Sequence, residues 1–480
     1  MITEAVLLVL PMLVGFYYNE NNFLAFLIPI VGLVSLGLPL MMIKGKDNSI
    51  LAKEGFVIVA LAWVILSLVG ALPFVISGEI PNFVNAVFET VSGFTTTGGS
   101  IVSDIESMSR ATMFWRLFTH WIGGMGVLVF VLAVLPANST GAMHLFRAES
   151  PGPSVGKLVS RLSFTARILY LIYGVLTVVE IIFLLFGGIG LYDSVLYAFS
   201  TAGTGGFGIY NESIAYHNSV YVEMVIAVFM MIFGVNFNVY YLVLIGQAGK
   251  AFKSEELRIY LGIVVVSTLV IALNILGQVS SFWEALRYSY FQVTSISSTT
   301  GFSSVDFDVW PAFSKCVLLI LSIMGASAGS TGGGVKVSRI VILFKSTIKD
   351  IKRLIYPRSV VSVSFEHQPI ERGTERGIRT YIILWLLIVV FSTLLLSLDN
   401  GANQVIAEME GGFSQIMSHL SASIACIGNI GPGIEAVGPT MNFAMYSPFS
   451  KILLSFVMLL GRLEIFPMII LFAPRTWKRG

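Results

Sequence analysis

Four short segments rich in glycine and threonine contain the residue types of this sequence that could bind an ion. They read FTTTGGS (94–100), AGTGGFG (202–208), STTGFSS (298–304) and IGNIGPG (427–433). Glycine permits positive φ angles, so successive carbonyl groups in such a loop can point inward and replace the hydration shell of an ion. Hydroxyl and amide oxygens stand beside these carbonyls, and ligands that are all oxygen favour a hard cation over a soft transition metal. The segments therefore predict a cation site.

The four segments align with one another as an internal repeat. One glycine of each falls in register, at intervals of about 100 residues with a longer last interval. A single cluster of this composition is typical of a surface turn, but four equivalent clusters favour one shared ion site. The candidate ligands are Thr96, Thr97, Gly98, Thr204, Gly205, Gly206, Thr299, Thr300, Gly301, Asn429, Ile430 and Gly431.

Each glycine segment follows a short stretch of helical character. These stretches are PNFVNAVFETVSG, LYDSVLYAFSTA, FWEALRYSYFQVTS and GGFSQIMSHLSASIA, and all are too short to span a bilayer. The carboxyl end of a helix carries a partial negative charge, so four such ends beside the loops favour a cation, whereas a phosphate site has the loop opening the helix. Irregular backbone at membrane depth requires burial in protein or a watery cavity, which predicts re-entrant loops around one pore.

Two segments resemble nucleotide-binding motifs. Residues 203–208 fit G-x-G-x-x-G, but the dinucleotide fingerprint follows a strand, whereas this segment follows a predicted helix. Residues 329–338 (GSTGGGVKVS) approximate a phosphate loop but carry one residue too many before Lys336. Neither segment is expected to bind a nucleotide, and no organic cofactor is predicted on this chain.

The elements that position these loops are predicted to be membrane helices. Hydrophobic residues make up 55% of the 480, charged residues make up 12%, and the mean hydropathy is +0.84, which excludes an ordinary soluble domain. The net charge of +2 predicts no nucleic-acid partner, and the two cysteines predict neither a disulfide nor a metal site. Ten spans are predicted, the eighth of them irregular, at residues 2–18, 22–43, 54–77, 111–136, 164–188, 219–246, 257–277, 313–343, 378–398 and 448–472.

The basic residues indicate the orientation in the membrane. Five segments hold 22 of the 29 Lys and Arg residues, namely 44–53, 144–167, 250–258, 339–379 and 475–480. The positive-inside rule places these segments, and with them both termini, in the cytoplasm. Residues 339–379 could lie against anionic lipid or dock a cytosolic regulator, and both interpretations stay open.

Small residues interrupt the eighth span. Residues 324–336 (MGASAGSTGGGVK) contain five glycines, each of which costs about 1 kcal/mol relative to alanine in a helix interior, so an unwound segment is expected. The alternative is close helix packing through a G-x-x-x-G pair, but the polar residues favour a wet surface. The predicted gate residues are Gly325, Gly329, Gly332, Gly333, Gly334, Lys336 and Arg462.

Arg462 and His120 stand inside predicted spans. An unpaired charge in a span is costly and usually functional, so we expect Arg462 to face the cavity under the loops and to help residues 324–336 to close it. The alternative is an ion pair with a carboxylate on another helix, such as Glu223 or Glu180. His120 could carry protons, but with Arg116 one turn away it is better explained as a packing residue.

The four repeats, HWIGGMG (120–126), FRAESPGP (146–153) and the broken eighth helix together resemble the TrkH potassium transporters of the Trk/Ktr/HKT superfamily, over essentially the whole chain. The resemblance implies an all-α polytopic membrane protein. In this fold two N-terminal helices precede four pseudo-symmetric helix–pore helix–helix repeats around one central pore. The implied units are residues 1–50 for the N-terminal pair and 51–145, 146–248, 249–358 and 359–480 for the repeats.

The same resemblance implies a function. It is channel-like uptake of K+, and of Rb+, across the bacterial inner membrane through a filter with one glycine per repeat. A homodimer, a cytosolic nucleotide-binding regulator of the TrkA type and membrane lipid are the implied partners, and K+ is the transported ion. The fourth repeat has NIG where the third has TTG, so the selectivity is expected to be loose. The chain is not expected to be an enzyme.

Three other functions fit parts of the sequence. A sodium- or proton-coupled potassium symporter of the Ktr type is the nearest, but the extra N-terminal pair and FRAESPGP disfavour it. A membrane-bound nucleotide-dependent enzyme would need a soluble catalytic domain, and no hydrophilic segment is long enough. A carrier for an organic solute is usually built from inverted repeats, whereas all four loops are predicted to enter from the same side.

Overall fold

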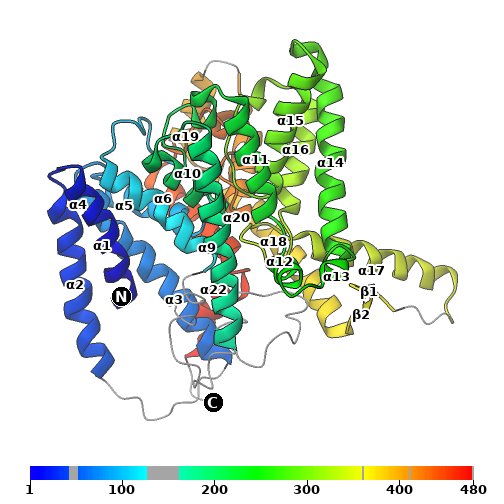
Figure 1. Cartoon of the computed structure of the whole chain (residues 1–480). Helices are drawn as coiled ribbons and strands as arrows, with labels where there is room; N and C mark the ends of the chain where they lie inside the picture. The colour runs from blue at the N-terminus through cyan, green and yellow to red at the C-terminus, as the bar shows by residue number, and fades with distance from the viewer. Residues whose placement is uncertain (43–51, 127–161, 359–361, 410–411, 478–480) are drawn as a thin grey trace.

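Helices build almost the whole molecule (Figure 1). The structure is a computed structural model that describes residues 1–42, 52–126, 162–358, 362–409 and 412–477. The α-helices are α1 (Ile2–Tyr17), α2 (Phe23–Met42), α3 (Ala52–Gly70), α4 (Leu72–Ile76), α5 (Phe83–Phe94), α6 (Arg110–Gly124), α9 (Leu162–Phe186), α10 (Leu191–Gly203), α11 (Val220–Phe233), α12 (Phe237–Leu244), α13 (Ala248–Ala251), α14 (Glu255–Ile275), α15 (Phe282–Ser297), α16 (Ala312–Met324), α17 (Val337–Ile355), α18 (Arg372–Leu396), α19 (Asn400–Glu408), α20 (Gln415–Gly428), α21 (Pro448–Arg462) and α22 (Phe466–Phe472). The two strands are β1 (Ser364–Phe365) and β2 (Gln368–Pro369).

Several helices are long and apolar enough to cross a membrane. Among the described residues these are α2, α3 continued through α4, α9, α14 and α18, and α11 with α12 forms a sixth span if the bent pair is counted as one. The outward faces of these helices are apolar and exposed: on α9, Leu171 is 67% exposed and Val178 is 55% exposed. Such faces are stable against lipid rather than water.

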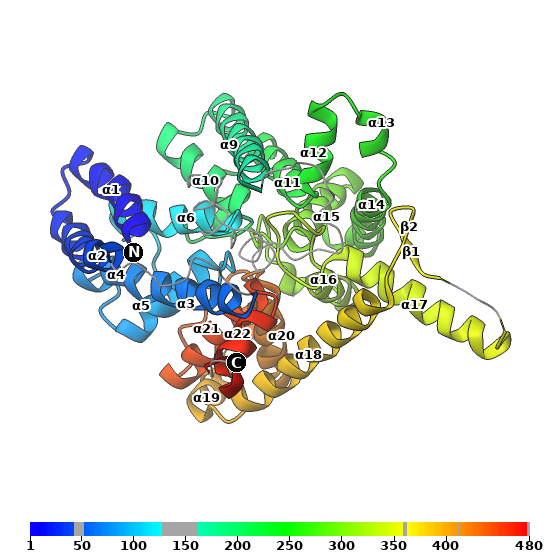
Figure 2. The ribbon, with the colours of Figure 1, turned by 90° about the horizontal axis from the view of Figure 1, so that it is seen from below.

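Four sections of the chain share one order of elements: a long helix, a short helix, a loop and a second helix. The long helices are α3, α9, α14 and α18, and the short ones are α5, α10, α15 and α20. Side chains of Asn82, Ser281 and Ser414 accept backbone N–H groups at the start of α5, α15 and α20, which explains why these short helices begin where they do. Figure 2 shows the sections in chain order around one centre, with α1 and α2 at the edge.

Each short helix packs against the second helix of the section before it. α10 packs against α6, α15 against α11, and α20 against α16. The contact between α5 and α21 then joins the fourth section to the first, where Lys451 Nζ donates to Asn85 Oδ1 at 3.0 Å. The sections therefore form a closed ring.

The second helices of the second, third and fourth sections are broken. The predicted interruption of span 313–343 is present as the segment between α16 and α17. The predictions that spans 219–246 and 448–472 are continuous are wrong. α11 and α12 meet at 89° around residues 234–236, and α21 and α22 are separated by residues 463–465. Span 111–136 is helical to Gly124, and its part beyond residue 126 lies outside the described residues.

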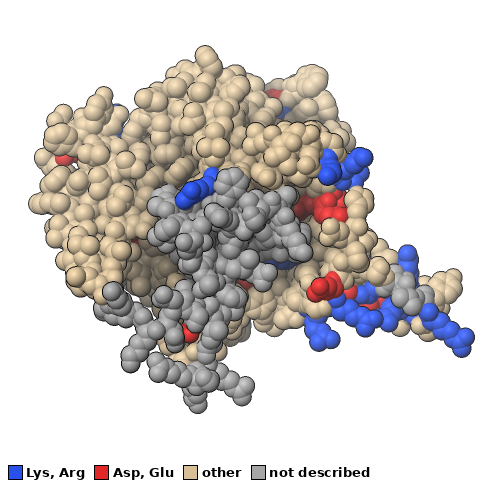
Figure 3. Space-filling view, turned by 60° about the horizontal axis from the view of Figure 1, so that its bottom comes forward, with Lys and Arg blue, Asp and Glu red and all other residues tan. Residues whose placement is uncertain are grey.

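Two features on the side of the molecule opposite the loops were not predicted. Strands β1 and β2 pair antiparallel as a small hairpin, so the all-α class holds except for these four residues. Helix α17 leaves the body across the direction of the long helices (Figure 1). Figure 3 shows Lys and Arg side chains gathered on this face, at the end where α17 leaves the body. The cytoplasmic location of residues 339–379 stays a prediction from these same basic residues.

Candidate ion filter and gate

The four glycine segments have one backbone conformation. Two positions of each have positive φ, and the second is always glycine: Thr96 (54°) and Gly98 (78°), Thr204 (53°) and Gly206 (78°), Thr299 (62°) and Gly301 (87°), and Asn429 (53°) and Gly431 (97°). Positive φ is unfavourable for a β-branched residue such as threonine. Its presence at three equivalent threonines shows that the surrounding structure imposes this conformation.

The conformation arises where each short helix ends. The N–H of the residue after the positive-φ threonine or asparagine donates to a carbonyl five residues back: Thr97 to Ser92 at 2.8 Å, Gly205 to Ser200 at 2.9 Å, Thr300 to Ser295 at 2.9 Å and Ile430 to Ala425 at 3.0 Å. This is the hydrogen bond of a Schellman motif, which ends a helix and reverses the chain. The reversal turns the carbonyl groups that follow away from the helix.

The loops meet around the centre of the ring. A Cβ atom built on Gly98 would overlap the carbonyl oxygen of Gly205. In the same way, Gly206 lies against the carbonyl of Thr300, Gly301 against that of Ile430, and Gly431 against that of Thr97, where the separation would be 2.7 Å. Real Cβ contacts are essentially never shorter than 3.0 Å. Only glycine therefore fits at these four positions, and each glycine faces the carbonyl of the next loop in cyclic order.

Most of the side-chain oxygens in the loops bond to protein. Thr97 Oγ1 accepts from Asn429 Nδ2 at 3.0 Å, Thr204 Oγ1 donates to the Gly203 carbonyl at 2.6 Å, and Ser298 and Thr300 share a hydrogen bond at 2.7 Å. Within the described part of the chain, Thr96 Oγ1, Ser304 Oγ and Asn429 Oδ1 are buried without a hydrogen-bond partner. The backbone carbonyls are thus better placed than the hydroxyl groups to serve as ion ligands.

Residues 325–336 form an irregular segment beside the third loop. Gly333 N–H donates to Thr299 Oγ1 at 2.6 Å, and a Cβ atom on Gly332 would lie 2.7 Å from the Ser298 carbonyl oxygen. Gly325, Gly329 and Gly334 have φ angles of 67°, 72° and 75°. The predicted unwinding is therefore present, and the predicted gate segment contacts the predicted filter.

The segment is anchored on its other side by α14 and by the break in α11 and α12. Glu256 Oε1 accepts from Ala328 N–H at 2.7 Å. Ser327 N–H donates to the Gly234 carbonyl at 3.1 Å, and Phe237 N–H donates to the Gly329 carbonyl at 3.0 Å. These bonds satisfy backbone groups that the unwound segment would otherwise bury without partners.

Arg462 reaches the same segment. It is the last residue of α21 rather than the middle of a continuous helix, so its predicted position is corrected. Nη1 donates to the Thr331 carbonyl at 2.9 Å, and Nη2 donates to the carbonyls of Gly123 and Gly124, the latter at 2.7 Å. The carboxylate suggested as an alternative partner, Glu223, lies 3.3 Å from Arg287 instead. The side chain joins residues 324–336 to the end of α6.

Comparison with known proteins shows where this architecture occurs. Residues 22–479 match the family model TrkH, which is described as a cation transport protein. The chain belongs to the TrkH family. TrkH of Salmonella typhimurium, named a Trk system potassium uptake protein, is 35% identical over 98% of this chain and 96% of its own length. The corresponding TrkG protein of Escherichia coli K12 is 33% identical over 98% and 94%. The crystal structure of the potassium transporter TrkH from Vibrio parahaemolyticus superimposes with a TM-score of 0.85 at 30% identity, over 99% of this chain and 96% of that one.

Membership in the TrkH family confirms that the chain is a multi-pass membrane transport protein and not an enzyme. Of the motifs that indicated the family, HWIGGMG forms the end of α6, and FRAESPGP (146–153) lies outside the described residues. Nothing in the family match assigns individual residues, so the ligands and the gate of this TrkH chain rest on the geometry above.

The structure of this TrkH chain favours a packing role for His120. Its ring stacks on Phe207 with centroids 4.2 Å apart, and Nδ1 lies 3.2 Å from Ser200 Oγ. A Cβ atom on Gly205 would overlap the imidazole. His120 therefore supports the second loop from behind, and proton transfer through it stays an untested alternative.

A half-buried carboxyl group lies near the outer ends of the third and fourth loops. Both oxygens of Asp308 accept from Glu435 N–H at 3.0 Å. Burial raises the pKa of Asp308 to about 6, although the Glu435 N–H opposes the rise. A carboxyl group with a pKa of about 6 gains its proton at a pH slightly below neutral.

Sequence analysis missed the role of three charged residues in this TrkH chain. Glu89 on α5 pairs with Arg116 on α6 at 2.7 Å, and both side chains are at most 1% exposed. Glu256 is also buried, in contact with residues 324–336. The available signal was a charged residue within an otherwise apolar segment. The partners of these residues could not be identified, because they lie on another helix or in a loop whose conformation the sequence does not reveal.

Proposed function

We propose that this chain takes up K+, and also Rb+, across the bacterial inner membrane by channel-like translocation through the four loops. The observation that carries the proposal is the closed ring, in which each of four glycines faces the carbonyl of the next loop. A ring of carbonyl groups can replace the water around an alkali cation. Relatives named as potassium uptake proteins, by sequence and by structure, support potassium as the ion.

The ligands that we propose are uncharged. They are the carbonyls of Thr97, Gly205, Thr300 and Ile430, each of which lies against the filter glycine of a neighbouring loop. Among the described residues, no cluster of three or more His, Cys, Asp or Glu could hold a metal ion. Transport requires binding that is weak enough for release, which neutral carbonyls provide. Because the fourth loop has isoleucine where the first and third have threonine, the ring is not fourfold symmetric, and loose selectivity is expected.

The proposed gate is the segment 324–336 with Arg462. The segment contacts Thr299 of the third loop, and Arg462 contacts the segment at Thr331. A cation beneath the filter also raises the electrostatic barrier to K+. Withdrawal of the segment would break its bond to Arg462 and open the path below the loops.

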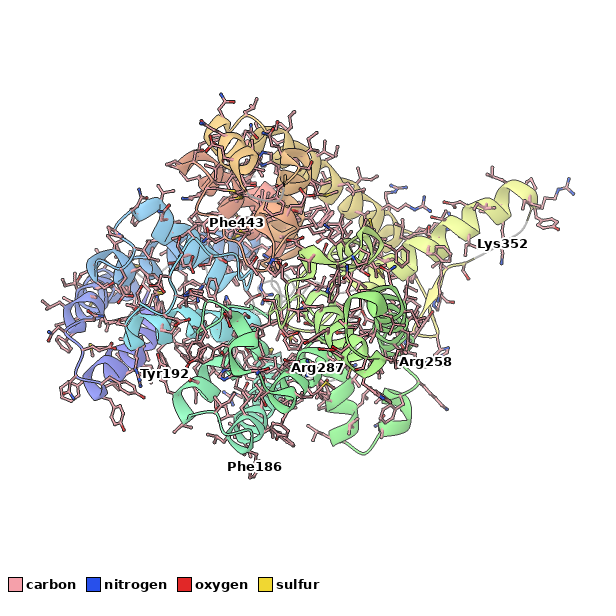
Figure 4. All side chains as sticks on the ribbon, turned by 90° about the horizontal axis from the view of Figure 1, so that it is seen from above. Phe186, Tyr192, Arg258, Arg287, Lys352 and Phe443 are labelled. Atoms are coloured by element: carbon pink, nitrogen blue, oxygen red, sulfur yellow. The ribbon has the colours of Figure 1, made fainter. Side chains whose placement is uncertain are left out.

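A cytosolic nucleotide-binding regulator of the TrkA type is the proposed controller of this gate. Helix α17 continues directly from the segment, and Lys352 lies at its far end, away from the body (Figure 4). The hairpin tip is also linked to α14, because Glu366 Oε1 accepts from Ser254 Oγ at 2.7 Å and from Glu256 N–H at 3.0 Å. Glu256 in turn holds Ala328 of the segment. A regulator that moves α17 or the hairpin would thus act on the gate.

Further parts of the proposal concern assembly and orientation. A homodimer is proposed from the family resemblance, and the exposed apolar helices supply surfaces for lipid. We propose that both termini lie in the cytoplasm, since the positive-inside rule locates the basic residues there. A sodium- or proton-coupled symporter of the Ktr type is less well supported, since the family match is to TrkH and the helices α1 and α2 are present.

Rubidium uptake into proteoliposomes tests the filter. Gly301→Ser places a Cβ atom onto the Ile430 carbonyl and should lower initial Rb+ uptake by about 100-fold, because a ring carbonyl must move. Gly262→Ser is the matched control, since no atom lies within 4 Å of a Cβ at that position on α14. Its uptake should equal that of the unchanged protein. Absence of Rb+ uptake by the unchanged protein, or equal uptake by Gly301→Ser, would refute the proposal.

A further inference from the structure

The ion pair between Glu89 and Arg116 lies directly behind two of the four loops. Glu89 is on α5 and Arg116 is on α6, and their side chains are 0% and 1% exposed. Among the ion pairs in the described residues, it is the one in which both partners are this deeply buried. Replacement of a buried pair by apolar residues is often neutral or stabilising, so fold stability alone gives little reason for its presence.

Glu89 holds the outer end of the first loop. Its carboxylate accepts from Ser100 Oγ at 2.9 Å and from Ile101 N–H at 2.9 Å. Ser100 follows the filter glycine Gly98 by two residues. The carboxylate therefore fixes the chain just beyond the ring of carbonyls.

Arg116 holds the equivalent point of the second loop. While Nε bonds to Glu89 at 2.7 Å, Nη1 donates to the Gly208 carbonyl at 3.0 Å, and Gly208 follows Gly206 by two residues. The guanidinium carbon also lies 3.6 Å from the ring centroid of Phe207. The planar guanidinium directs its donors at fixed angles, so one side chain sets the distance between two neighbouring loops.

The other two loops are held differently. Ile214 N–H donates to the Ser303 carbonyl at 3.2 Å, and Gly433 N–H donates to the Val437 carbonyl at 2.7 Å. These are the positions that correspond to Ser100 and Gly208, and both are held by uncharged groups. The Ser100 carbonyl likewise accepts from Phe443 N–H at 2.8 Å, so the bonds from Glu89 and Arg116 are an additional attachment of the first and second loops. The charged bridge is therefore specific to the contact between the first and second loops.

We propose that Glu89 and Arg116 are positioning residues that hold the first and second loops at a fixed separation and thereby set the preference of the ring for K+ over Na+. The inference rests on the proposed filter. The first and second loops meet where Gly98 lies against the Gly205 carbonyl. The ion pair acts on this contact, because Ser100 is two residues from Gly98 and Gly208 is three residues from Gly205. A ring whose loops can approach one another also accommodates the smaller Na+.

Arg116→Lys separates geometry from charge. Lysine keeps the positive charge beside Glu89 but has one ammonium group, which cannot reach both Glu89 and the Gly208 carbonyl in the directions of a guanidinium. Initial uptake of Rb+ and of Na+ is measured in the same proteoliposomes. We expect Rb+ uptake to stay within about twofold and the Rb+/Na+ ratio to fall by about tenfold, the effect of one lost charge-assisted hydrogen bond.

Ser100→Ala and Arg287→Lys complete the set. Ser100→Ala removes one hydrogen bond from Glu89, leaves both charges in place and should lower the ratio by about threefold. If Arg116→Lys does not fold, Ser100→Ala tests the positioning role in its place. Arg287→Lys is the matched control, because Arg287 on α15 (Figure 4) pairs with Glu223 on α11 rather than with Glu89. Its ratio should equal that of the unchanged protein.

The outcomes separate this inference from the proposed filter. A lower ratio in Arg116→Lys or Ser100→Ala, with an unchanged ratio in Arg287→Lys, supports the positioning role. An unchanged ratio in the folded variants, or a loss of uptake for both ions to the same extent, overturns it. If Gly301→Ser still abolishes uptake in that case, the filter stands without the bridge. If Gly301→Ser has no effect, the filter itself is wrong.

Discussion

Replacing Arg462 with methionine removes every donor of the proposed gate residue while keeping much of its side-chain length. Arginine Nη1 donates to the Thr331 carbonyl at 2.9 Å, and Nη2 donates to the Gly124 carbonyl at 2.7 Å. These bonds connect residues 324–336 to the end of α6, so they stabilise the conformation in which the segment lies under the loops. Their loss should favour withdrawal of the segment.

The size of the effect follows from the number of bonds that opening must break. The bond from Arg462 Nη1 to the Thr331 carbonyl joins the side chain to the segment that would move. A hydrogen bond with a charged donor contributes about 1.5 to 3 kcal/mol, and 1.4 kcal/mol corresponds to a factor of ten in an equilibrium constant. The open fraction should therefore rise by about 10- to 100-fold in Arg462→Met. Removal of the positive charge lowers the barrier to K+ and acts in the same direction.

The assay is initial Rb+ uptake into proteoliposomes without any regulator, at equal amounts of folded protein. Arg462→Lys keeps the charge but can donate to fewer of the three carbonyls, so its uptake should lie between those of the unchanged protein and Arg462→Met. Arg258→Met is the control, since Arg258 on α14 (Figure 4) donates to the nearby backbone carbonyls of Ser254 and Lys253. Unchanged or lower uptake by well-folded Arg462→Met would show that Arg462 does not hold the gate closed.

Two further predictions concern carboxyl groups. Glu256→Gln weakens the hydrogen bond from Ala328 N–H, so Rb+ uptake without a regulator should rise about threefold. Uptake equal to that of the unchanged protein would show that Glu256 does not hold the gate segment. Asp308 has a folded-state pKa of about 6, above its ordinary value, so the native state binds this proton more tightly and gains stability as the pH falls through 6. Asp308→Asn should abolish that part of the gain and, at pH 7.5, raise the thermal midpoint by about 1 to 2 °C. A pH dependence identical to that of the unchanged protein would contradict the assignment.

The loops were predictable because their requirement is local. A backbone that turns at the end of a short helix and faces a neighbouring carbonyl needs glycine, and Gly98, Gly206, Gly301 and Gly431 therefore stand out in the sequence. Their common φ angles agree with that interpretation. That threonine hydroxyls serve as ligands stays a prediction. The sequence could not show that a hydroxyl group bonds to a distant partner, as Thr97 does to Asn429, which lies 332 residues away.

The breaks in the second helices were less predictable because distant contacts cause them. A Cβ atom on Gly461 would overlap the Ile427 carbonyl of α20, and one on Gly234 would overlap the Tyr260 hydroxyl of α14. A single glycine in an apolar run does not reveal such a neighbour. The third break was predicted because five glycines within 13 residues disfavour a helix in any surroundings. The ion pair between Glu89 and Arg116 was also missed, because the local sequence around either residue does not reveal its partner.

The contact between α5 and α21 also determines when the pore can form during synthesis. Lys451 and Asn85 are separated by 366 residues, so α5 leaves the ribosome long before its partner exists. Until then the face of α5 that α21 will cover has to be shielded by lipid, by other parts of the chain or by a chaperone. Contacts of such long sequence separation fold slowly. Assembly of the ion path is therefore among the last events in the biogenesis of this protein, after its earlier helices have entered the membrane.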